Sequence, residues 1–244
     1  MKIMKQNRSF LTIAAASLAM GATQLHAGSI IGTVTLDADS GVYPGIGGGE
    51  FTAVTQTGPS YINNYAADAT YSGGFETFCL ETGVDFTPGT TYYYSLGNVT
   101  QPVPVTGTGS ATPLSAGAAW LYSEFAKGTL SGFDYTYGST RQGDDNLLQS
   151  AIWAFQGQSY GSYPYGGAGN TYYDEAVTAL GGVTAATANY TGTSVEILQM
   201  WTGTDMSSGE AAQNQLVLVP DGGLTVALLG FALVGLQGLR RKLA

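Results

Sequence analysis

The spacing of apolar residues changes twice along the chain, and this change limits the folds that are open to it. Four early segments are β-branched and partly alternating, as strands between glycine-rich turns are. They cover residues 29–36, 51–57, 74–80 and 91–96. From about residue 112 to 181 the apolar positions instead recur at helical spacing, and residues 193–201 and 213–219 return to the strand pattern. We expect an α+β fold, a β-sheet or barrel-like domain with a helical insertion.

Three helices are predicted within the insertion, at about residues 112–127, 144–155 and 171–180. Thr112 is the expected N-cap of the first helix, and the proline that follows it suits a first helical position. The second helix is expected to start at Asp144 or Asp145, and Thr171, with Asp174 three residues later, is the expected cap of the third. The folded region as a whole is expected to span residues 28–215.

The charges are separated along the sequence. Six of the 8 Lys and Arg residues lie at the two ends, so Lys127 and Arg141 are the cations in a body that holds all 17 acidic residues. Such a body should repel phosphate backbones, and we expect no nucleic-acid partner. One Cys and one His cannot supply a usual zinc site, so we expect no metal and no cofactor.

The N-terminus has the three parts of a secretory signal. Lys2, Lys5 and Arg8 precede an apolar run at residues 10–20, and small residues lead to Ala27. We predict a signal peptide at residues 1–27, which contains the single histidine. An N-terminal membrane anchor is the alternative, but it needs about 20 apolar residues.

The C-terminus also has three parts. The motif Val219-Pro220-Asp221-Gly222-Gly223 precedes an uncharged run at residues 224–239, and Arg240, Arg241 and Lys242 follow it. The run is a predicted transmembrane helix, with the basic cluster on the cytoplasmic side. The alternative is an ordinary membrane anchor.

This arrangement over residues 219–244 resembles the PEP-CTERM class of sorting signals, in its VPDSG variant with Gly222 in place of serine. The resemblance implies that an exosortase, a membrane protease-transpeptidase, cuts near the motif. It also implies that the protein crosses the inner membrane and reaches the envelope, outer surface or extracellular matrix of a Gram-negative bacterium.

Several patterns bear on chemistry without specifying it. The pairs Glu76 and Glu81, or Asp144 and Asp145, could serve a carboxylate-based glycoside hydrolase. Residues 157–161 match the G-x-S-x-G motif of serine hydrolases, but the mature chain has no histidine to act as the base. The turn at residues 37–41 has too few ligands for calcium, and the glycines at 45–49 indicate a flexible turn rather than a phosphate loop.

Cys79 and Gln149 form the most specific pattern. Phe78-Cys79-Leu80-Glu81, on a predicted strand, and Leu148-Gln149-Ser150-Ala151-Ile152-Trp153, on a predicted helix, resemble the Cys-Gln thioester (TQXA-type) domains of bacterial adhesins. The resemblance implies that Cys79 donates the sulfur and Gln149 the acyl group of an internal thioester. Phe78, Leu80, Ile152 and Trp153 would keep water from this bond. A buried, inert Cys79 is the alternative.

The resemblance implies a covalent surface adhesin whose thioester acylates an amine on its target. Because the acyl group is consumed, we expect a single-use binder and not an enzyme. The main alternative is a structural biofilm protein that associates non-covalently with extracellular polysaccharide, through exposed tyrosines such as those at residues 160–165. A carboxylate-based hydrolase is the third.

Overall fold

The computed structural model describes residues 30–38, 48–59, 74–100, 111–158, 167–204 and 211–219. The predicted signal peptide, the tyrosines at 160–165, and the sorting signal beyond Val219 lie outside the described residues. The statements that follow concern the described ranges.

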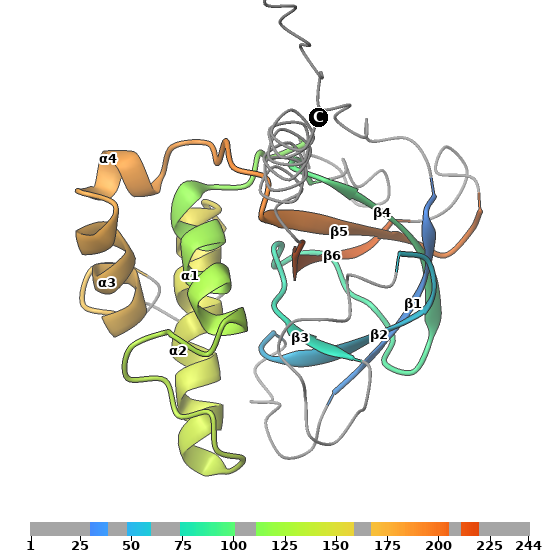
Figure 1. Ribbon diagram of the computed structural model, residues 1–244, viewed down its shortest axis with the longest axis horizontal. Coiled ribbons are helices and arrows are strands. Elements are labelled where there is room, and N and C mark those ends of the chain that lie inside the picture. The colour runs from blue at the N-terminus through green and yellow to red at the C-terminus, as the bar shows by residue number, and fades with distance from the viewer. Residues whose placement is uncertain are drawn as a thin grey trace, which may run out of the picture.

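A six-stranded antiparallel sheet forms one layer of the fold, with the strand order β3-β2-β1-β4-β5-β6 (Figure 1). Its strands are β1 (Gly32–Asp37), β2 (Phe51–Thr57), β3 (Phe75–Thr77), β4 (Thr91–Gly97), β5 (Val195–Trp201) and β6 (Ala211–Leu218). Burial alternates along β1, where Val34 and Leu36 face the core. This alternation is the period of a strand with one covered face, as the sequence predicts.

The sheet curls until its two edge strands meet. Directly after β3, Cys79 forms an isolated antiparallel bridge with Gln215 of β6. Two backbone hydrogen bonds flank this bridge, from Leu80 N to Asn214 O at 3.1 Å and from Leu216 N to Phe78 O at 3.2 Å. We call this junction of residues 77–81 with residues 213–216 the seam. The bridge gives the curled sheet a shape close to that of a barrel, and it contains Cys79.

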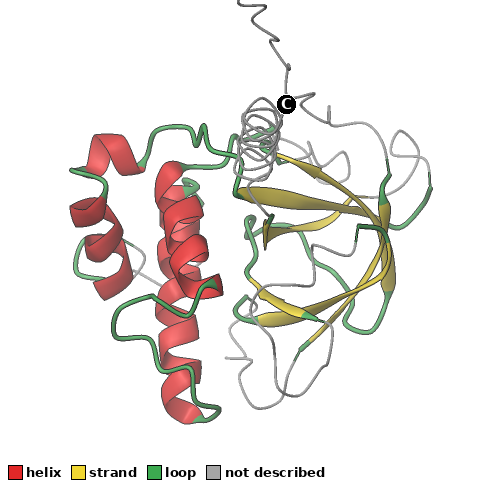
Figure 2. Cartoon of the chain, viewed as in Figure 1, coloured by secondary structure: helices red, strands yellow, loops and turns green. Residues whose placement is uncertain are grey.

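The helices lie between β4 and β5 in the sequence and cover one side of the sheet (Figure 2). They are α1 (Ala116–Ala126), α2 (Ser139–Phe155), α3 (Thr171–Ala179) and α4 (Val183–Ala186). Helices α1 and α2 pack closely, because a Cβ at Gly117 would lie 2.7 Å from the Phe155 ring. A large apolar core joins these helices to β5 and β6.

The starts of α1 and α2 differ from the prediction. Helix α1 is capped by Ser115, whose hydroxyl accepts a hydrogen bond from Ala118 N–H, and not by Thr112. Thr112 instead pairs with Thr100: its N–H donates to Thr100 Oγ1, and its C=O accepts from Thr100 N–H, each at 2.9 Å. Helix α2 begins at Ser139, before the predicted aspartates. Its first turns are polar, and the pattern of apolar residues gives no signal there.

The α+β class is confirmed, with a curled six-stranded sheet and helices inserted between two of its strands. The sequence predicts Thr171 as the cap of helix α3, but its N-cap is Asn170, whose side chain accepts from Tyr172 N–H and Tyr173 N–H, and Thr171 is its first helical residue. Within the described residues, no helix combines the length and the apolar character needed to cross a membrane. The predicted transmembrane helix at 224–239 lies outside those residues.

Candidate functional site

Cys79 lies at the seam with its sulfur next to a side-chain carboxamide. The Nε2 atom of Gln215 donates to Cys79 Sγ at 3.5 Å. Both residues are fully buried. Strand β6 presents Gln215 to the sulfur because the two residues are directly opposite in the bridge, which brings side chains of the same face together. The signal for Gln215 in the sequence is the run of three amide residues at 213–215 inside an otherwise apolar strand.

Gln149 also contacts Cys79, but at its main chain. The Oε1 atom of Gln149 accepts from Cys79 N–H at 2.9 Å and from Gly49 N–H at 3.0 Å, while its Nε2 atom donates to Cys79 O at 2.8 Å. The structure thus brings the two predicted residues together, although 70 positions separate them. Gln149 acts on the main chain of Cys79 in the way that a neighbouring strand would.

The two carboxamides therefore differ in what they are free to do. The Gln149 group satisfies three main-chain groups, and those bonds would have to break before its carbonyl carbon could react. The Oε1 atom of Gln215 is buried and has no hydrogen-bond partner among the described residues. A buried carbonyl without a donor is an uncommon feature in a folded protein, and such groups often mark reactive or strained sites.

The four residues predicted to shield the bond are all buried. Trp153 belongs to the same apolar cluster as Cys79, whereas Phe78, Leu80 and Ile152 belong to the core beneath the helices. Gly48 also packs at this place, since a Cβ there would lie 2.4 Å from the Trp153 ring and 3.1 Å from Gln149 Cγ. The glycine turn at 48–49 therefore packs against Trp153 and Gln149 of α2. The sequence did not indicate this contact.

Burial decides the resting state of the sulfur. It raises the pKa of the Cys79 thiol far above its ordinary value, and the nearby carboxylates of Glu81 and Asp85 act in the same direction. Hydrogen bonds from Gln215 and from the Gly49 backbone oppose this shift but are the smaller effects. Cys79 is a neutral thiol at neutral pH, which protects it from unwanted reactions with solutes.

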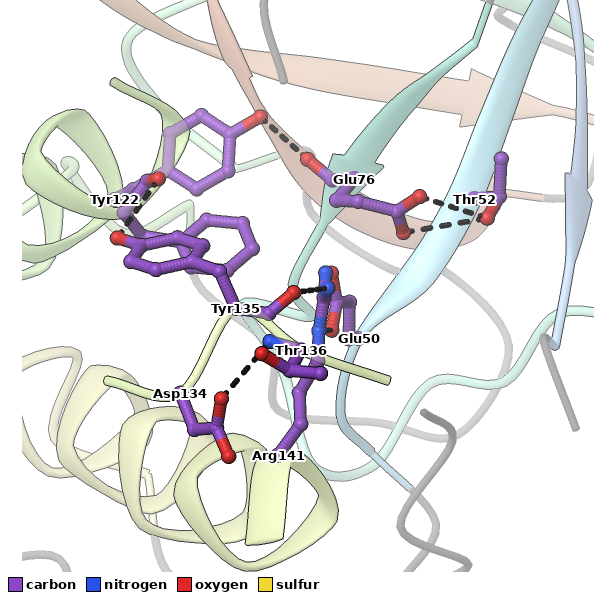
Figure 3. Close-up of polar contacts among 9 residues, drawn as sticks. Glu50, Thr52, Glu76, Tyr122, Asp134, Tyr135, Thr136 and Arg141 are labelled. Carbon is purple, nitrogen blue, oxygen red and sulfur yellow. Dashed lines mark hydrogen bonds and ion pairs between the residues drawn. The ribbon is translucent and has the colours of Figure 1, made fainter. Parts of the chain in front are cut away.

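A buried ion pair fixes the turn that leads to Gly49. Glu50 accepts two hydrogen bonds from the Arg141 guanidinium, one of them at 2.8 Å from Nε, and Arg141 also donates to Tyr135 O at 2.8 Å (Figure 3). Burial and the adjacent Glu50 raise the pKa of Asp145 well above its usual range, so this carboxyl carries a proton at neutral pH. Through its ion pair with Glu50, Arg141 connects the first turns of α2 to the start of β2.

The carboxylates considered for hydrolase chemistry have other partners. Glu76 accepts two bonds from the Thr52 hydroxyl, at 3.0 and 3.2 Å, and Glu81 accepts bonds from Asn214. Asp144 accepts from Asp134 N–H at 2.8 Å. Among the described residues no group of His, Cys, Asp and Glu could hold a metal ion.

Comparison with known families identifies the C-terminus. A family model described as the VPDSG-CTERM motif matches residues 219–243. No curated protein and no solved structure matches the chain. The chain therefore carries a C-terminal sorting signal of this kind, which implies processing by an exosortase and export to the cell envelope or surface.

Proposed function

We propose that the exported protein is a covalent surface adhesin in which Cys79 forms an internal thioester, with Gln215 as the acyl donor. The observation that carries this proposal is the 3.5 Å contact between Gln215 Nε2 and Cys79 Sγ in a fully buried seam. Gln149 stays the donor indicated by the family resemblance. We favour Gln215 because its carboxamide faces the sulfur, whereas that of Gln149 faces the main chain.

The proposed reaction needs no oxidant or cofactor. Cys79 Sγ attacks the carbonyl carbon of Gln215, a carbon–sulfur bond forms, and the bond to Nε2 breaks. The thiol proton leaves with the nitrogen as ammonia. An amine on a target surface can later attack the same carbon, and the thiol is then regenerated as its leaving group. Each molecule reacts once, so the protein is a single-use binder and not a turnover enzyme.

The mass of the exported protein tests the thioester. We expect an intact mass that is short by one ammonia, with a cross-link between the peptides that contain Cys79 and Gln215. Cys79→Ala and Gln215→Met should have full mass. Gln56→Met is the control and should keep the shortfall, because Gln56 is an exposed glutamine of β2 whose amide donates to Val54 O and lies outside the seam.

The alternative outcomes separate the candidates. A cross-link to the Gln149 peptide would move the acyl donor to that residue. Full mass and a free thiol in the wild-type protein would exclude the thioester and leave a non-covalent structural or biofilm protein. To find the target amine, surfaces would be compared for covalent attachment of the wild-type protein and of Cys79→Ala, which should not attach.

Processing of the sorting signal is tested separately. We propose that the signal delivers the protein to the envelope of a Gram-negative cell, with residues 224–239 as a temporary membrane anchor. Replacing Pro220 and Asp221 by alanine should leave the full-length protein in the membrane fraction. Cleavage at the normal site in this variant, measured by mass spectrometry of the exported product, would contradict the assignment. Ala substitution of Thr202, far from the motif in sequence, is the control.

A further inference from the structure

Glu81 connects the cysteine segment to the strand that carries Gln215. Its Oε2 atom accepts from Asn214 N–H at 3.1 Å, and its Oε1 atom accepts from the Asn214 side-chain amide. The main-chain carbonyl of Glu81 accepts from Gln213 Nε2 at 2.7 Å. Three contacts thus join this residue to the two positions that precede Gln215 on β6.

The seam needs such contacts because its main-chain pairing is short. The bridge between Cys79 and Gln215 is isolated, with one backbone hydrogen bond on either side. A slip of one residue would turn the Gln215 side chain to the opposite face of the sheet, since side chains alternate along a strand. Two hydrogen bonds that Asn214 donates to the Glu81 carboxylate oppose that slip.

We propose that Glu81 is a positioning residue for thioester formation: its carboxylate, held by Asn214, keeps Cys79 in register with Gln215. This inference rests on the proposed function. Glu81 acts through Asn214 and the main chain, and it is not assigned a bond to the reacting atoms. Glu81 was paired with Glu76 as a candidate carboxylate of a hydrolase, and the proposal gives it a different role.

The protonation of Glu81 gives this role a measurable signature. Burial raises the pKa of Glu81 to about 7, although the bonds from Asn214 oppose the shift. Among the described residues, Glu81 and Asp85 act electrostatically on the Cys79 thiol, while β6 contributes the uncharged residues 213–215 to this junction. Above pH 7 the carboxylate accepts both bonds from Asn214. Below it, one oxygen carries a proton and resembles the amide of glutamine.

The test compares rates of ammonia loss while unfolded, unprocessed precursor refolds from urea between pH 5.5 and 8.5. We expect the wild-type chain to react about tenfold faster than Glu81→Gln above pH 7, where one charged hydrogen bond is lost, and at the same rate at pH 5.5. Because the Glu81 carboxylate also raises the pKa of the Cys79 thiol, its loss in Glu81→Gln would by itself make the variant react faster, and this works against the expected difference. The midpoint of the ratio of the two rates should lie near pH 7.

Glu196→Gln is the matched control. Glu196 is half-buried on β5, and burial raises the pKa of its carboxyl. It lies opposite Val217, two positions along β6 from Gln215, and it does not take part in the bonds between Glu81 and Asn214. Its rate should equal that of the wild type at every pH. A Glu81→Gln rate equal to the wild-type rate throughout would overturn the positioning role.

A second measurement separates this inference from the thioester itself. In the Gln215→Met background there is no acyl donor, and the readout is alkylation of Cys79 by iodoacetamide. We expect Glu81→Gln to raise the alkylation rate about tenfold at pH 8 and to leave it unchanged at pH 5.5. Asp85→Asn also removes a carboxylate that raises the pKa of Cys79, but not the two bonds from Asn214, and its effect should be smaller. Absence of ammonia loss in the wild type would refute the proposed function, whereas unchanged alkylation here would refute the role of Glu81.

Discussion

Replacing Arg141 with methionine is expected to lower the free energy of unfolding by about 3–5 kcal/mol at pH 7, because it leaves a buried carboxylate without its cation. Glu50 is completely buried, and Arg141 is only slightly exposed. Without the guanidinium, Glu50 loses its ion pair and two hydrogen bonds while the Asp145 carboxyl remains beside it. Urea unfolding, followed by circular dichroism, measures the loss.

Lys127→Met is the matched control for this prediction. The ion pair of Lys127 with Glu124 spans 3.9 Å on the surface of α1, and the lysine side chain is 49% exposed. Exposed pairs of this kind contribute about 0–1 kcal/mol, so the control should remain close to wild type. Equal losses in the two variants would contradict the assignment of a buried ion pair.

A double variant separates the pair from the space it fills. Glu50→Met combined with Arg141→Met should regain most of the stability lost by Arg141→Met alone, since a buried ion pair replaced by apolar side chains is often neutral. Failure of this recovery would mean that the hydrogen bond to Tyr135 O, and not the charge pairing, carries the effect. The consequence for the site is local, because Glu50 follows Gly49, whose N–H binds Gln149.

The sequence predicts elements better than it predicts the partners of polar side chains. The strand pattern at residues 29–36 predicts β1, because one buried face imposes an alternation that can be read locally. The start of α2 could not be read in this way. Its first turns contain Arg141, whose partner Glu50 lies 91 residues away. An ion pair between distant segments leaves no periodic signal in either of them.

The site shows the same division. Cys79 and Gln149 were paired by a family resemblance, and the fold brings them into contact. The resemblance did not indicate Gln215, because its relation to Cys79 depends on how far the sheet curls before its edges meet. Gly48 and Gly49 were interpreted as a flexible turn. Their packing on Trp153 and Gln149 depends on the tertiary position of α2.

Gln149→Ala is expected to lower the free energy of unfolding by about 4 kcal/mol, since it removes the hydrogen bonds that Gln149 makes to three buried main-chain groups. These groups are Cys79 N–H, Cys79 C=O and Gly49 N–H. Each unsatisfied buried group costs about 1–3 kcal/mol. The cysteine segment should also open more often, so alkylation of Cys79 in the Gln215→Met background should become faster. Urea unfolding and the alkylation rate are measured on the same protein.

Gln156→Ala provides the control, because Gln156 repeats this arrangement seven residues later, at the end of α2. Its Oε1 atom accepts from Ser115 N–H at 2.7 Å, and its Nε2 atom donates weakly to Pro113 O at 3.4 Å. With one strong bond lost, the free energy of unfolding should fall by about 1–3 kcal/mol, and the alkylation rate of Cys79 should stay at the wild-type level. If both variants expose Cys79 equally, the reactivity follows global stability, and Gln149 has no specific hold on the cysteine. A specific effect of Gln149 would mean that α2 holds the main chain of Cys79 while β6 supplies the carboxamide, so that each glutamine has its own task.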